Sequence, residues 1–116
     1  MRYSVLFFDD GPARAQLRLE DWRALGAAHE AFRQTLTDAG ATVTDHQVLE
    51  PPATTTTLEF DAGRLTQRRA GPHVETRFVL GGFYVVEVEN GDTLLDLLNA
   101  APLPRGTGFV EVRPVV

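Results

Sequence analysis

Apolar residues recur along the chain at two different spacings, which predict helices and strands. Between Glu20 and Ala39 apolar side chains return every three or four residues, as on one face of a helix, and Gly40 follows as a typical C-terminal residue. Arg2–Phe8 is apolar at nearly every position, which is typical of a strand covered on both faces. We expect a loop between these two elements, beginning with Asp9–Gly11 as a solvated acidic turn.

Shorter elements are predicted in the rest of the chain. Asp92 is a good N-cap for a short helix that runs to about Asn99, before two prolines. Asp61–Gly63 suits the loop of a hairpin, with glycine at the left-handed position. Alternating or β-branched residues predict strands at Ala41–Leu49, Thr54–Phe60, Arg64–Arg69, Gly82–Glu89 and Gly108–Val115.

This order of elements predicts an α+β sandwich, in which two helices cover one face of an antiparallel sheet. The valines of the last two predicted strands would pack beneath the helices. The other face of the same strands carries aromatic and charged residues together: Phe83, Val85, Phe109, Glu87, Glu111 and Arg113. Such a mixed face is expected to meet a second subunit, a ligand or both, so we expect a homodimer.

Composition favours a single domain, residues 1–116, of an ordinary globular protein, with 43% hydrophobic and 23% charged residues. The net charge of -5 argues against nucleic-acid binding, because phosphate neutralisation needs a surplus of Lys and Arg. No apolar run reaches the roughly 20 residues of a membrane-spanning helix. A leader peptide is not recognisable either, so the expected location is cytoplasmic.

Several residue types are missing, and their absence narrows the chemistry. The chain has no cysteine, all 11 basic residues are arginine, and Ser4 is the only serine. Thiolate catalysis, Schiff bases, a Walker-type phosphate loop and a serine nucleophile are therefore excluded or very unfavourable. The histidines, His29, His46 and His73, share no metal-ligand spacing. We accordingly expect neither a metal nor an organic cofactor.

Three segments together resemble a known family: AGPHVETRFVLGGFYVVEVEN, LEPPATTTTLEF and FVEVRPV. They are similar to YCII-related proteins of the DGPF branch, whose hallmark reads DGPF-x-E-T-K-x-x-x-G-G-F-Y. The resemblance implies a ferredoxin-like fold that dimerises into an α/β barrel. Related dimeric barrels include isomerases, lyases and dehydrochlorinases that use His and carboxylate chemistry without a cofactor. Here Ala70 replaces the hallmark aspartate, His73 its phenylalanine and Arg77 its lysine.

Two histidines are the candidate catalytic residues. His73 follows a Gly-Pro turn, where it would act as a general acid or base oriented by Glu75, or else simply complete a loop. His29 lies in the apolar stripe of the long helix, so it should face the sheet or the mouth of a cleft beside it. His46 is expected to point to solvent. Candidate ligand-binding residues are Arg77, Glu87, Glu111 and Arg113. The alternative role for the last three is to form salt bridges between neighbouring strands.

The sequence leaves two functions open. The first is a cofactor-independent enzyme acting on a small molecule by His/carboxylate acid-base chemistry, of isomerase, lyase or cyclase type. The second is a non-catalytic dimeric module that binds a small ligand or a regulatory protein, since the hallmark aspartate is lost at Ala70. Convergence of His73, His29 and the charged sheet face on one pocket would favour the enzyme, and scatter of these residues would favour the module.

Overall fold

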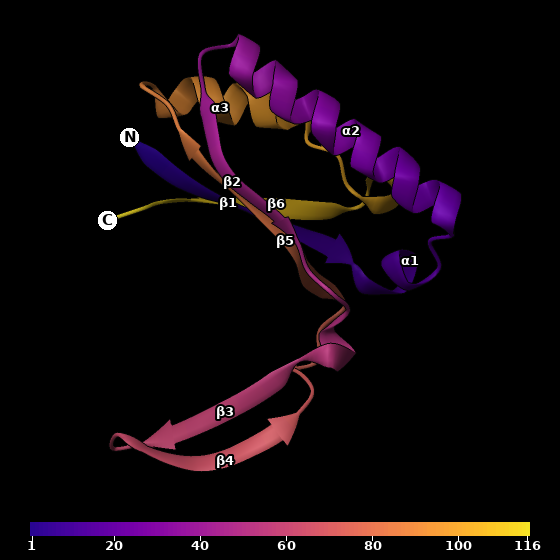
Figure 1. Ribbon diagram of the computed structural model, residues 1–116, viewed down its shortest axis with the longest axis vertical. Helices are drawn as coiled ribbons and strands as arrows, with labels where there is room; N and C mark the ends of the chain where they lie inside the picture. Colours follow the sequence, from indigo (N-terminus) through magenta and orange to yellow (C-terminus); the bar gives the residue numbers. More distant parts are fainter.

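The computed structural model describes residues 1–116 and consists of a four-stranded antiparallel sheet with helices on one face and a separate two-stranded hairpin (Figure 1). The sheet has the order β2 (Thr42–Val48), β5 (Phe78–Glu87), β1 (Arg2–Asp10) and β6 (Gly108–Pro114). The hairpin is formed by β3 (Thr56–Asp61) and β4 (Arg64–Ala70). The helices are α1 (Gly11–Ala15), α2 (Leu19–Asp38) and α3 (Gly91–Leu97), with short 3-10 turns at Pro52–Thr54, Leu98–Ala100 and Pro104–Gly106.

The predicted α+β, ferredoxin-like arrangement is confirmed. Helix α2 starts one residue before the predicted start and ends one before the predicted end. Strand β5 begins at Phe78, four residues earlier than predicted, because it continues to pair with β1 beyond a bulge at Phe7/Phe8. The predicted loop after the first strand is wrong in part, since Gly11–Ala15 forms the short helix α1 with a proline in its first turn.

The core lies between the sheet and the helices α2 and α3. Its most deeply buried side chains are Val5, Leu36, Val86 and Leu94, which come from β1, α2, β5 and α3. The valines of β6, Val110 and Val112, are partly buried and pack against this cluster, as predicted. One face of each central strand therefore supplies the core, and the alternate residues point to the opposite side of the sheet.

The face of the sheet away from the helices is partly open and aromatic. Phe109 stacks on Phe8 with ring centroids 5.0 Å apart and lies 5.3 Å from Phe78. Phe83 and Val85 are only half-buried, whereas Glu111 is exposed. This mixed apolar and charged character is the one that the strand pattern predicts.

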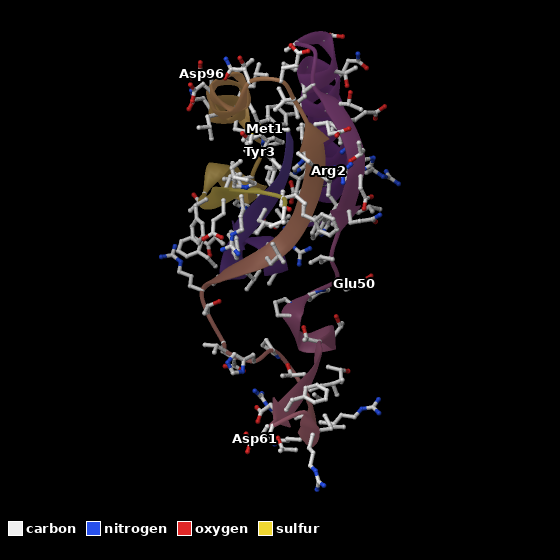
Figure 2. All side chains as sticks on the ribbon, turned by 90° about the vertical axis from the view of Figure 1, so that its left-hand side faces the viewer. Met1, Arg2, Tyr3, Glu50, Asp61 and Asp96 are labelled. Carbon is white, nitrogen blue, oxygen red and sulfur yellow. The ribbon has the colours of Figure 1, made fainter.

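The β3–β4 hairpin projects away from the sheet as an arm. Figure 2 shows its tip at Asp61 at the end of the molecule opposite to Asp96 of α3, with the chain narrowing near Glu50. Three apolar side chains of the arm, Leu58, Phe60 and Leu65, are 49%, 63% and 53% exposed. An isolated two-stranded hairpin is at best marginally stable in water, so the arm needs support at its root or a covering surface.

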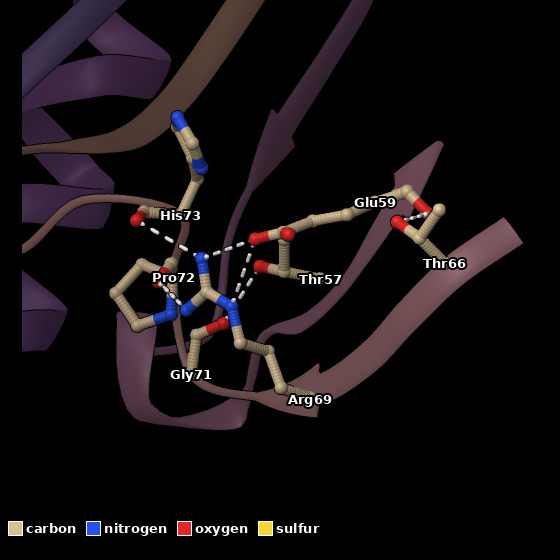
Figure 3. A network of polar contacts seen from close by, with 7 residues as sticks. All are labelled: Thr57, Glu59, Thr66, Arg69, Gly71, Pro72 and His73. Atoms are coloured by element: carbon tan, nitrogen blue, oxygen red, sulfur yellow. Dashed lines mark hydrogen bonds and ion pairs between the residues drawn. The ribbon is translucent and has the colours of Figure 1, made fainter. Parts of the chain in front are cut away.

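Arg69 supplies part of that support at the root of the arm (Figure 3). Its Nε donates to Glu59 Oε1 at 3.2 Å across the hairpin, and its two terminal nitrogens donate to the carbonyls of Pro72 and His73, each at 3.1 Å. Thr57 Oγ1 donates to the Gly71 carbonyl at 2.7 Å. These bonds tie the strands of the arm to the loop that leads into β5.

Candidate functional site

A cavity of about 240 Å³ lies between α2 and the sheet. One wall is a face of α2 on which Trp22, Leu25, Gly26, His29 and Arg33 follow one another at helical spacing. The opposite wall comes from β1, β2 and β5, and α1 closes one end with Arg14. Apolar and titratable side chains therefore face the same small space.

Asp9 and Arg14 form a buried ion pair at the α1 end of the cavity. Arg14 Nε lies 3.2 Å from Asp9 Oδ2, and the two residues are each only 6% exposed. Nη2 of Arg14 donates to the Leu49 carbonyl at 2.5 Å, and its guanidinium lies 5.1 Å from the centre of the Trp22 ring. The Nε–H group, although close to the carboxylate, is not aligned to hydrogen-bond it and has no partner.

Burial raises the pKa of Asp9 above its usual value, and the nearby Arg14 opposes that rise. A carboxyl group with a raised pKa holds a proton more strongly once it has taken one. Asp9 is thus a carboxylate on a cavity wall whose proton affinity suits a general base better than that of an exposed aspartate.

Gly81 makes the position of Asp9 possible. A Cβ atom at residue 81 would overlap the Asp9 carboxyl group, and one at Gly82 would lie 2.6 Å from the carbonyl oxygen of Gln47 on β2. Neither glycine has a positive φ, so the requirement is for space and not for an unusual backbone. The Gly81-Gly82 pair of β5 therefore admits the Asp9 side chain and the close approach of β2.

His29 and Tyr84 form the second polar group of the cavity. His29 Nδ1 and the Tyr84 hydroxyl are 2.5 Å apart, and the edge of Phe7 packs against the imidazole at 5.1 Å between centroids. Burial, followed by the charges of Arg33 and His46, lowers the pKa of His29 to about 4. Burial also raises the pKa of Tyr84, against the effect of Arg33. Both side chains are therefore neutral near pH 7, and their hydrogen bond fixes the orientation of the imidazole.

Arg33 lies beside this pair. Its guanidinium is 5.8 Å from the centre of the Tyr84 ring, and no carboxylate lies within ion-pair distance of it. His46 is exposed, as predicted, but it also lines the cavity, with its ring 6.4 Å from that of Tyr84. This end of the cavity thus carries one unpaired positive charge.

The candidate catalytic residues do not share one cavity. His29 faces the sheet and a cavity, as predicted for it. His73 is exposed in the loop before β5, where its carbonyl accepts from Arg69, and it does not line the cavity of His29. Glu75 is exposed and lines a different, more open cavity of about 660 Å³ at the root of the hairpin.

The candidate ligand-binding residues also lie elsewhere. Arg77 pairs with Asp10, its Nη2 donating to Oδ2 at 3.0 Å and its Nε to Oδ1 at 3.5 Å. That contact lowers the pKa of Asp10. Glu87 is 3.6 Å from Arg2 on the neighbouring strand, which matches the alternative of a cross-strand salt bridge. Glu111 and Arg113 are exposed and make no ion pair.

The prediction of a solvated turn at Asp9–Gly11 is wrong. Asp9 and Asp10 are 6% and 7% exposed, because β1 continues through both and each meets an arginine. Sequence reasoning missed four titratable residues of the cavity: Asp9, Arg14, Arg33 and Tyr84. Only Asp9 had a signal in the sequence: the adjacent pair Gly81-Gly82 in an otherwise apolar strand, since glycine inside a strand marks a close approach and Gly81 leaves room for the Asp9 carboxyl group.

Comparison with models of protein families gives a match. A family model described as a YCII-related domain matches residues 1–116. No curated protein matches the chain. The helices include none with the length and apolar character needed to cross a membrane, and His, Asp and Glu side chains form no group of three that would hold a metal ion.

Proposed function

The chain belongs to the YCII-related family, and from the contents of its cavity we propose that it is an enzyme that moves a proton within a small molecule without a cofactor. The observation that carries this proposal is that one cavity is lined by a buried carboxylate, Asp9, and by a hydrogen-bonded imidazole and phenol, His29 and Tyr84. The reaction would be of isomerase or lyase type, with proton abstraction from carbon as its first step.

Asp9 would act as the general base. Its raised pKa brings the proton affinity of the carboxylate closer to that of a carbon acid, and general acid-base catalysis contributes about 10²–10⁴-fold in rate. Arg14 would keep Asp9 ionised between turnovers, because removal of the guanidinium would raise the carboxyl pKa further. Asp9 then returns the proton to another carbon of the same molecule, or passes it to a leaving group.

His29, held by Tyr84, would stabilise the negative charge that forms when carbon loses its proton. With a pKa of about 4, His29 is a neutral imidazole and acts as a hydrogen-bond donor rather than as a cation. A neutral donor aimed at a developing oxyanion stabilises the transition state. The bond to Tyr84 holds the imidazole in place for this role.

Hydrogen exchange tests the proposal without knowledge of the natural substrate. The protein is incubated in D₂O with a set of small ketones and carboxylic acids that carry acidic C–H bonds, and deuterium incorporation at carbon is followed by NMR. We expect exchange in at least one compound and a fall of about a hundredfold in the Asp9→Asn variant. Asp45→Asn, an exposed aspartate on β2, is the matched control. Equal rates for Asp9→Asn and the wild type would contradict the assignment.

We further propose that the protein is a homodimer that covers the open sheet face, as in an α/β barrel. The chain exposes 7801 Å², whereas a compact monomer of this mass exposes about 6,300 Å². The excess of about 1,500 Å² exceeds the roughly 800 Å² that each partner buries in a standard interface. The radius of gyration, 16.0 Å, is also above the value of about 13 Å for a compact chain of this length.

Light scattering at micromolar concentration is expected to give twice the mass of the 12.8 kDa chain. Phe109→Glu would place a charge among the aromatic rings of the open face, so it should shift the mass toward that of the monomer. A wild-type protein that scatters as a monomer would remove the basis for the barrel.

A second candidate function is a dimeric module that binds a small ligand without turnover. The observation in its favour is that His73 and Glu75 lie away from the cavity of His29. Such a module would bind in the same cavity but show no deuterium exchange in any compound, and its Asp9→Asn variant would bind as the wild type does.

A further inference from the structure

We infer that the ligand of the cavity is a small organic anion with a flat, unsaturated body, of the class of aromatic and conjugated monocarboxylates, and that Arg33 binds its carboxylate. The inference deepens the proposed function, since it concerns the same cavity. It depends on the charges and shapes of the cavity walls and not on turnover.

The balance of charge in the cavity favours an anion. Its charged side chains are Asp9, Arg14 and Arg33. Asp9 and Arg14 neutralise each other at 3.2 Å, whereas Arg33 has no carboxylate within ion-pair distance. Since His29 is neutral near pH 7, the cavity holds one uncompensated positive charge. A carboxylate against a guanidinium makes the strong, charge-assisted type of hydrogen bond.

The position of Arg33 suits a ligand that carries its charge at one end. Along α2 the cavity residues run from Trp22 to Arg33, a distance of about 16 Å at 1.5 Å per residue. Arg14 lies over Trp22 at one end of this row, and Arg33 lies over Tyr84 at the other. A carboxylate at Arg33 would therefore leave the body of the ligand directed along the helix toward Asp9.

The walls between the two ends favour a flat body. Three aromatic side chains that face this space line the cavity: Phe7 of β1, Tyr84 of β5 and Trp22 of α2. Flat rings stack on or meet the edges of other rings with a gain of about 0.5–1.5 kcal/mol beyond burial of area. The volume of about 240 Å³ is below the usual range for drug-sized ligands. An acid with a single ring fits both the size and the chemistry.

Fluorescence of the single tryptophan tests the inference directly, because Trp22 is a cavity residue. The probes are benzoate and benzamide, which have similar shape but differ in charge. We expect saturable changes with both and a dissociation constant for benzoate at least about tenfold lower, the factor that corresponds to one modest charged contact. No saturable change with benzoate, or equal affinity for benzamide, would overturn the inference.

Two variants locate the charge that is responsible. Arg33→Gln should remove most of the preference for benzoate over benzamide. Arg23→Gln removes the same charge from an exposed position on the same helix and should preserve the preference. If both variants lose the preference, the effect comes from net charge, and if both keep it, another group binds the carboxylate; either result means that Arg33 is not the binding residue. Benzoate binding together with no deuterium exchange in any compound would reject the proposed enzyme and keep the anion site. Deuterium exchange without a preference for benzoate over benzamide would keep the enzyme and reject the anion site.

Discussion

Replacing Arg14 by methionine is expected to lower the free energy of unfolding by about 3–5 kcal/mol near neutral pH, because it leaves the buried carboxylate of Asp9 without its counter-charge. Methionine keeps most of the length of the side chain and its contact with Trp22, so packing is largely preserved. Arg23→Met, at an exposed position on α2, should change stability by less than about 0.5 kcal/mol.

The loss should depend on pH in a defined direction. Burial already raises the pKa of Asp9 in the folded state above 3.8, and removal of Arg14 raises it further. An acid whose pKa is higher in the folded state than in the unfolded state binds protons more strongly when the protein is folded. The free energy of unfolding therefore falls as the pH rises from the pKa of the unfolded state through the pKa of the folded state. The Arg14→Met deficit is therefore expected to be larger at about pH 8 than at about pH 5.

Urea denaturation of both proteins at equal concentration measures this difference. His29 also titrates, and its lowered pKa removes stability as the pH falls from 6.5 toward about 4. That contribution is expected in the wild type and the variant alike, so it largely cancels in the comparison. The double variant Asp9→Asn/Arg14→Met should recover much of the loss. A deficit independent of pH would show that the carboxylate is not the cause.

The sequence predicted the elements whose signal is local. Helix α2 follows from a stripe of apolar residues at helical spacing, and the hairpin follows from a glycine at the turn between two β-branched or polar runs. The five-residue helix α1 is too short to show any periodicity and begins with Gly11-Pro12, a pair that usually marks a turn. Elements held in place by their neighbours are not visible in a local pattern.

The cavity was predicted only in part, for the same reason. His29 was found because it shares the apolar stripe of α2. Asp9 was missed because an aspartate beside a turn is usually solvated, and its burial depends on Arg14, Gly81 and the bulge between β1 and β5. Tyr84 belongs to a strand whose alternation predicts a core residue, and nothing local reveals that its hydroxyl meets His29. His73 was predicted as a catalytic residue because it replaces the phenylalanine of the hallmark, yet it lies outside this cavity.

The second large effect is expected from Gly81→Ala. The new methyl group would occupy the position of the Asp9 carboxyl group, which must then turn away from its present place beside Arg14. Separation of this buried pair is expected to lower the free energy of unfolding by about 3 kcal/mol. The backbone at Gly81 has no positive φ, so strain in the main chain does not contribute. Gly26→Ala is the matched control: its methyl group would meet nothing within 4 Å, and alanine should stabilise α2 by up to about 1 kcal/mol.

A double-mutant cycle decides whether Gly81 acts through Asp9. If the glycine serves to place the carboxylate beside Arg14, then Gly81→Ala and Arg14→Met disrupt the same ion pair, and their combined cost should fall short of the sum of the single costs by at least about 1 kcal/mol. Gly81→Ala should also slow the deuterium exchange that depends on Asp9, because the base has moved. Additive costs together with unchanged exchange would mean that alanine is accommodated by a shift of β5, and that the space at residue 81 serves the packing of the sheet and not the position of the carboxylate.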